Sequence, residues 1–259
     1  MSSPGHFAVR EHGSGPGVLW LHGYTMDSSL WQPLWELLPD WRHVGVDLPG
    51  HGATSRPLSA EGGFAGLASE LADVLRSRNI SRVVALSFGT TAALQLAIDH
   101  PDLVSRLVLA APTVAGGAGA PRVAERYRDL RRLFATFGPG RHMTDLWMQS
   151  PPDIFRGTES RPLVRERIRT VVDRHRWTEL ANGAMRQLNQ HLQSTAALAG
   201  IPASVLCVVG EQDMPAFGDN AGTLRRTVPD CRVTTVPGTG HLPLLESPEV
   251  VAPEIGAHL

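Results

Sequence analysis

The sequence contains no lysine and only two cysteines. Cys207 and Cys231 are too few for a disulfide framework, and both are interpreted as small apolar residues in or beside strands. All 24 basic residues are arginine, a bias that a GC-rich coding sequence would produce. The formal net charge of −1 predicts no general attraction to nucleic acid or to anionic membranes.

The sequence also lacks long apolar runs and the spacings typical of metal ligands. No run approaches the length of a membrane span, and the first six residues have neither the basic start nor the apolar stretch of an export signal. His142, His175 and His191 are not spaced as metal ligands, and no H-x-x-x-H or C-x-x-C occurs. We therefore expect a cytoplasmic protein without a metal, a cofactor, a nucleic-acid partner or a membrane partner. The sequence carries no signal for the oligomeric state.

One serine stands between a segment with the pattern of a buried strand and a segment with the pattern of a helix. Residues 82–86 are mostly β-branched or apolar, Ser87 follows, and residues 92–97 continue at helical spacing. A tight turn at this serine needs small residues two positions before and after it, and these are Ala85, where glycine is usual, and Gly89. The pattern predicts a nucleophile elbow, with the hydroxyl exposed at a helix N-terminus whose dipole favours negative charge.

Two later strand ends supply partners for this serine. Residues 204–209 predict a buried strand that leads into Asp213, and residues 232–236 predict another that leads through a glycine-rich loop to His241. A serine nucleophile needs a base to take its proton and an acid to orient that base. The sequence therefore predicts a catalytic triad of Ser87, His241 and Asp213.

Glu211 and Asp219 are the alternative acids, because they lie close to Asp213 in the sequence. Residues 111–113, at the end of another expected strand, contain no carboxylate and are excluded as the source of the acid. Two further histidines, His22 and His51, fall in loop motifs, where backbone geometry and packing explain them better than chemistry.

These motifs resemble the α/β-hydrolase fold superfamily over nearly the whole chain. Residues 17–24 resemble the strand and HG-x oxyanion loop of that family, and residues 43–52 resemble its D-x-x-G-H-G segment. The chain order of serine, aspartate and histidine is also the order of the family. The resemblance implies an α/β fold with a mostly parallel central sheet flanked by helices. It also implies that the backbone N–H groups of Tyr24 and Phe88 form an oxyanion hole.

The middle of the chain follows a different pattern, because strands stop after residues 107–112 and amphipathic helices follow. The family places a helical cap after its sixth strand, so we expect a core of residues 1–112 and 201–259 with a cap of residues 113–200. A cap would exclude water and shape the substrate pocket. The apolar residues expected to mark its three helices are Val123, Tyr127, Leu130, Leu133 and Phe134; then Val164, Ile168, Val171 and Val172; then Leu180, Leu188 and Leu192.

The expected cap is also the basic part of the chain. Residues 113–200 contain 14 arginines against 8 acidic residues. Such a surplus is compatible with a small-molecule substrate that carries an anionic group such as a carboxylate or a phosphate, and equally with a solvated basic surface. For any single arginine, a solvated helix face is the better interpretation.

The predicted function is that of a serine hydrolase that cleaves a carboxylic ester, a thioester or a lactone through an acyl-enzyme, without a cofactor. Carbon–carbon hydrolases, small aminopeptidases and the cofactor-free lyase of menaquinone synthesis share the triad and remain alternatives. That lyase typically has an arginine four residues after the serine, where this chain has Thr91. A non-catalytic small-molecule binder on the same scaffold is a third alternative, and the complete triad argues against it.

Overall fold

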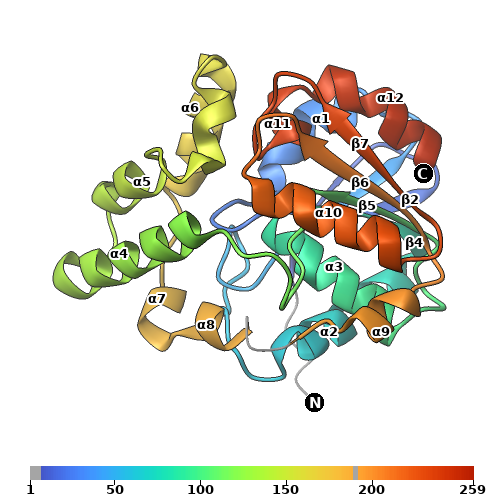
Figure 1. The fold of residues 1–259 in the computed structure, drawn as a ribbon, viewed down its shortest axis with the longest axis horizontal. Coiled ribbons are helices and arrows are strands. Elements are labelled where there is room, and N and C mark those ends of the chain that lie inside the picture. Colours follow the sequence, from blue (N-terminus) through green and yellow to red (C-terminus); the bar gives the residue numbers. More distant parts are fainter. Residues whose placement is uncertain (1–6, 189–191) are drawn as a thin grey trace.

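The computed structural model describes residues 7–188 and 192–259, and it shows a sheet-centred core with a group of helices projecting from one end (Figure 1). Residues 1–6 and His191, which entered the sequence predictions, lie outside the described residues. Within the described residues, the strands form one seven-stranded sheet in the order β1-β3-β2-β4-β5-β6-β7. The strands are β1 (Ala8–His12), β2 (Gly17–Leu21), β3 (Arg42–Asp47), β4 (Ile80–Leu86), β5 (Arg106–Ala110), β6 (Ser204–Gly210) and β7 (Cys231–Val236).

The sheet is parallel except at one edge, where β1 pairs antiparallel with β3. The central strands read as continuous apolar runs rather than as alternating ones, and β2 is buried along its whole length. Such runs are expected where helices cover both faces of a parallel sheet. The mostly parallel sheet flanked by helices that the sequence predicted is thus confirmed.

Helices cover the two faces of the sheet. One face carries α2 (Gly63–Arg78), α3 (Phe88–Asp99) and α10 (Pro215–Thr227), and the other carries α1 (Gln32–Glu36), α11 (Pro243–Glu246) and α12 (Pro248–His258), as Figure 1 shows. A short 3-10 turn, Ser28–Trp31, leads into α1. No helix among residues 7–188 and 192–259 is long and apolar enough to cross a membrane.

A helical segment separates β5 from β6 and forms the projecting part in Figure 1. The strand before it is β5 in this chain's own numbering, whereas the sequence analysis counted strands in the order of the family, in which the cap follows the sixth. The last helix of the segment, α9 (Thr195–Ala199), packs on α3 and α10 of the core. The other elements are α4 (Pro121–Phe137), α5 (Arg141–Trp147), a 3-10 turn (Asp153–Thr158), α6 (Pro162–Val172), α7 (Glu179–Asn182) and α8 (Ala184–Leu188).

The first two helices expected in the cap are confirmed as α4 and α6. Gly138, in a left-handed conformation with φ of 71°, ends α4. The third expected helix is divided into α7 and α8 at Gly183, whose φ of 68° breaks the helical path. Between α4 and α6 lies one short helix, α5, which the sequence analysis did not predict because a run of seven residues is too short to show a clear period.

Candidate active site

Ser87 lies at the sharp turn between β4 and α3. Its φ of 50° and ψ of −119° fall in a region that residues with a side chain rarely adopt. The turn brings Gly89 against the strand beside it, and a Cβ on that glycine would lie 2.6 Å from the His22 carbonyl oxygen. Ala85, fully buried, pairs with Leu21 in the neighbouring strand β2. The turn therefore requires glycine after the serine and accepts alanine before it.

The structure brings the side chains of the predicted triad together. The Ser87 hydroxyl lies 2.9 Å from His241 Nε2, and His241 Nδ1 lies 3.0 Å and 3.2 Å from the two carboxylate oxygens of Asp213. Because a carboxylate only accepts, Nδ1 carries the proton and Nε2 is free to accept from the serine. This hydrogen-bond order is the one that a serine nucleophile and its base require.

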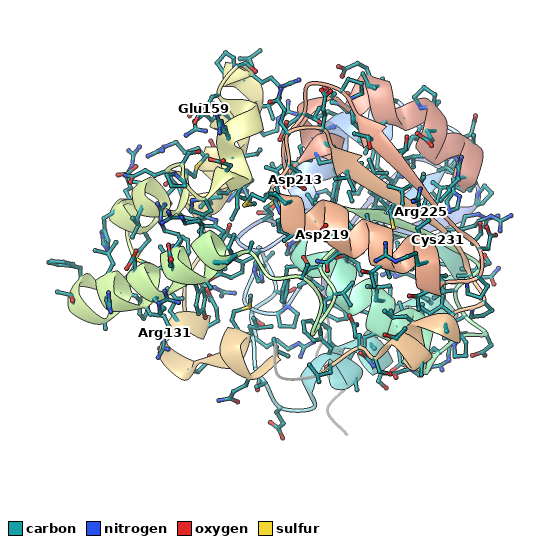
Figure 2. The ribbon with its side chains drawn as sticks, viewed as in Figure 1. Arg131, Glu159, Asp213, Asp219, Arg225 and Cys231 are labelled. Carbon is teal, nitrogen blue, oxygen red and sulfur yellow. The ribbon has the colours of Figure 1, made fainter. Side chains whose placement is uncertain are left out.

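The alternative acids lie elsewhere. The Glu211 carboxylate accepts from the exposed Gly238 amide, and Asp219 is exposed on α10. Figure 2 shows Asp213 at the end of α10 nearest the cap, with Asp219 farther along the helix. Of the three acids, Asp213 alone accepts a hydrogen bond from the imidazole of His241.

The loop that carries His241 is held by Glu246, a residue that the sequence analysis did not single out. The buried Glu246 carboxylate accepts from the Gly240 amide at 2.6 Å and from the Leu242 amide at 3.0 Å, one on each side of the histidine. Arg161 of the cap lies 4.0 Å from the same carboxylate. A glutamate five residues after the histidine is only a weak sequence signal, because its role depends on how the loop folds back.

The loop after β2 lies against the elbow. A Cβ on Gly23 would lie 3.5 Å from the Ser87 Cβ, so the loop approaches the serine closely at this glycine. Phe88 is the first residue of α3, where a backbone N–H has no acceptor within the helix. The rings of Tyr24 and Phe88 are 6.4 Å apart between centroids. Both residues expected to form the oxyanion hole thus lie beside the serine. The binding of an oxyanion by their backbone amides remains a prediction.

The rings of His22 and His51 form hydrogen bonds with the backbone and have a structural role. His22 Nδ1 donates to the Gly23 carbonyl at 2.8 Å, and its Nε2 accepts from the Leu48 amide at 2.9 Å. His51 Nδ1 donates to the Pro49 carbonyl at 2.9 Å. Burial lowers the pKa of His22, and burial, with smaller contributions from the neighbouring His175, His22 and Arg176, lowers the pKa of His51 well below its ordinary value. Both rings are therefore neutral, which agrees with the packing role expected for them.

Two arginines of the cap stabilise its fold by donating hydrogen bonds to backbone carbonyls. Arg126 donates to the carbonyls of Gln149 and Pro151, and Arg165 donates to those of Phe155 and Met148. Contacts of this kind use the guanidinium as a multiple donor to backbone oxygens. For these two arginines, the structure gives no support to binding of an anionic substrate group.

A buried carboxylate faces the oxyanion loop from the cap. Glu179, fully buried at the start of α7, accepts through Oε1 from the Tyr24 hydroxyl and from His175 Nε2, the latter at 3.1 Å. Burial raises the pKa of Glu179, but the hydrogen bonds and the charge of its partners outweigh burial and hold this pKa below its ordinary value. The sequence analysis missed this residue, because a single glutamate on a cap helix looks like a solvated surface residue.

Metal binding has no support in the described part of the chain, where no group of three or more His, Cys, Asp or Glu side chains is arranged to hold an ion. The two cysteines lie in the neighbouring strands β6 and β7, with their sulfurs 3.9 Å apart.

The fold and the site define a hydrolase of the α/β class, and comparison with known proteins agrees. The model of the alpha/beta hydrolase family matches residues 18–254, so the chain belongs to this family.

The chain is similar to enzymes with more than one activity. It is 30% identical over 253 residues to the 2-succinyl-6-hydroxy-2,4-cyclohexadiene-1-carboxylate synthase of Enterobacter sp. (strain 638), covering 92% of this chain and 89% of the relative. It is 28% identical over 245 residues to the pimeloyl-[acyl-carrier protein] methyl ester esterase of Nitrosomonas europaea, covering 93% and 94%. Among solved structures, a thermophilic esterase from Thermogutta terrifontis matches with a TM-score of 0.80 and 25% identity, covering 96% of this chain and 91% of the esterase.

Proposed function

We propose that the protein is a serine hydrolase that cleaves a carboxylic ester, a thioester or a lactone. The observation that carries this proposal is the unbroken chain of contacts from the Ser87 hydroxyl through the His241 ring to the Asp213 carboxylate. The esterase relatives support the same reaction class. A small-molecule substrate with an anionic group, suggested by the basic cap, stays a prediction.

In the proposed mechanism, His241 takes the proton of Ser87 as the serine oxygen attacks the carbonyl carbon of the substrate. The negative charge on the former carbonyl oxygen is stabilised by the backbone N–H groups of Tyr24 and Phe88. The intermediate collapses, His241 gives its proton to the leaving group, and an acyl-enzyme remains on Ser87. Water, deprotonated by His241, then attacks the acyl carbon and releases the acid and the free serine.

The second candidate is the activity of the cofactor-free lyase. A synthase that is 30% identical to this chain over 92% of its length supports this candidate. At Thr91, where that lyase typically has an arginine, the hydroxyl is buried and donates to the Thr113 carbonyl at 2.9 Å. Position 91 therefore ties α3 to the segment after β5, and this argues for the hydrolase over the lyase.

A fluorophosphonate probe and a panel of model acyl substrates test the proposal. We expect the probe to label the wild-type protein at Ser87 and not to label Ser87→Ala, and we expect the wild type to release acid from p-nitrophenyl esters or from acyl thioesters. Ser87→Ala should lose at least about 10³-fold in kcat. Labelling without turnover of any ester, thioester, lactone or aminoacyl amide would favour the lyase. Tight ligand binding without any labelling would favour the non-catalytic binder.

A further inference from the structure

The loop after β2 carries a backbone conformation that needs support. Thr25 has a φ of 63°, in the left-handed region that β-branched residues avoid. Such a residue costs on the order of 1–3 kcal/mol and persists only where its surroundings hold it. Within the loop, the Thr25 hydroxyl donates to the Tyr24 carbonyl at 2.6 Å, and the Met26 amide donates to the Gly23 carbonyl at 3.2 Å.

The cap supplies further support from two of its helices. The indole N–H of Trp147, on α5, donates to the Thr25 hydroxyl at 2.8 Å. The Tyr24 hydroxyl donates to the carboxylate of Glu179, on α7. All four side chains are at least nine-tenths buried, so these hydrogen bonds lie where water competes little. The loop is thus held by hydrogen bonds from cap residues that lie more than 120 positions away in the sequence.

A third contact joins the cap to this loop at its outer end. Arg174, in the connection between α6 and α7, lies 3.0 Å from the Asp27 carboxylate. Its side chain is 57% exposed, and an exposed ion pair contributes little to stability. The two buried hydrogen bonds therefore dominate the attachment of the cap to the loop.

Glu179 is itself held in place for this contact. His175, four residues earlier in the chain, donates to the same oxygen that accepts from Tyr24, and its ring lies 4.8 Å from that of Trp177. Tyr24 in turn packs edge-on to the rings of Trp147, His175 and Trp177, at 5.5 to 6.3 Å. A fully buried carboxylate without partners would be costly, so the hydrogen bonds from Tyr24 and His175 together offset the burial of Glu179.

We propose that Glu179 is a positioning residue that acts on the oxyanion hole through the Tyr24 side chain, so that docking of the cap and alignment of the Tyr24 amide are one event. This inference rests on the proposed function, in which the Tyr24 amide binds the developing oxyanion. A donor that is displaced by even a fraction of an ångström stabilises the transition state less, while binding of the ground state changes little. The effect is expected in kcat rather than in KM.

The test uses Tyr24→Phe, which removes the hydroxyl and keeps the ring, together with Glu179→Leu, which removes the acceptor and keeps an apolar side chain of similar size, and the double variant. We expect Tyr24→Phe to lower kcat for p-nitrophenyl butyrate about 10- to 100-fold, with KM changed less than about threefold. The second-order rate of fluorophosphonate labelling should fall in parallel, because attack at phosphorus develops the same negative oxygen. The double variant should be no worse than the more damaged single variant, since both changes break one hydrogen bond.

Arg169→Gln is the matched control. Arg169 pairs with Asp145 inside the cap and does not contact the loop, so this change should leave kcat unaltered. Thermal melts of each variant separate a folding defect from a positioning defect.

The inference is wrong if Tyr24→Phe lowers only the melting temperature, if it raises only KM, or if the two single changes add in the double variant. If instead the wild type neither reacts with the fluorophosphonate nor hydrolyses the ester, the proposed function fails and not the positioning role alone.

Discussion

The backbone strain at Ser87 predicts that the protein is more stable with glycine at this position than with alanine. Both Ser87→Ala and Ser87→Gly remove the hydroxyl and its hydrogen bond to His241, so that loss cancels between them. Alanine keeps the Cβ in the region of φ 50° and ψ −119°, whereas glycine adopts this conformation without a steric penalty. The difference between the two variants therefore reports the strain together with the greater freedom of glycine in the unfolded chain.

The magnitude follows from two opposing terms. Relief of strain contributes about 1–3 kcal/mol, and the greater freedom of glycine in the unfolded chain subtracts about 0.4–1 kcal/mol. Taking the middle of each range, Ser87→Gly should exceed Ser87→Ala in free energy of unfolding by about 1.3 kcal/mol, measured by urea denaturation at equal m-values. The control is Ser69, exposed in the interior of α2, where the glycine variant should instead be less stable than the alanine variant by about 0.5–1 kcal/mol. Equal stability of the two Ser87 variants, or greater stability of the alanine variant, would refute the strain at the elbow.

Glu246→Gln should lower kcat about tenfold with little change in KM, because an NH₂ donor replaces one of the two oxygens that accept from the histidine loop. The exposed Glu249→Gln should match the wild type in the same assay. Gly89→Ala should lower kcat at least tenfold, since its Cβ meets backbone oxygens at 2.6 and 2.7 Å, while Gly218→Ala, with no atom within 4 Å, should not. Burial lowers the pKa of His43 to about 4 in the folded protein, whereas the pKa of this residue in the unfolded chain is about 6.5. As the pH falls, His43 is therefore protonated first in the unfolded chain. The free energy of unfolding should therefore drop between pH 6.5 and 4, by up to about 3 kcal/mol from this residue, and His43→Gln should flatten that slope in denaturant titrations; an unchanged slope would contradict the burial argument.

Local chemistry in the sequence was enough to predict the elbow and the strand ends. Small residues around Ser87, an apolar run before it and a helical run after it are all properties of neighbours in the chain. The same holds for the ends of β6 and β7, after which Asp213 and His241 follow. Because parallel strands bring their carboxyl ends to one edge of a sheet, the meeting of these three side chains followed once the strands were placed in one sheet.

The contacts of Glu246 and Glu179 could not be predicted in this way. Glu246 holds the histidine loop only because α11 folds back onto it, and Glu179 meets Tyr24 across 155 positions of chain because the cap docks on the loop after β2. In the sequence, each is a single acid on a short helix, which is typical of a solvated surface. The sequence by itself therefore determined the sheet, the turn and the candidate triad, whose signals are local. Only the tertiary structure decided which buried acids support that triad, since burial and long-range pairing turn a surface residue type into a partner.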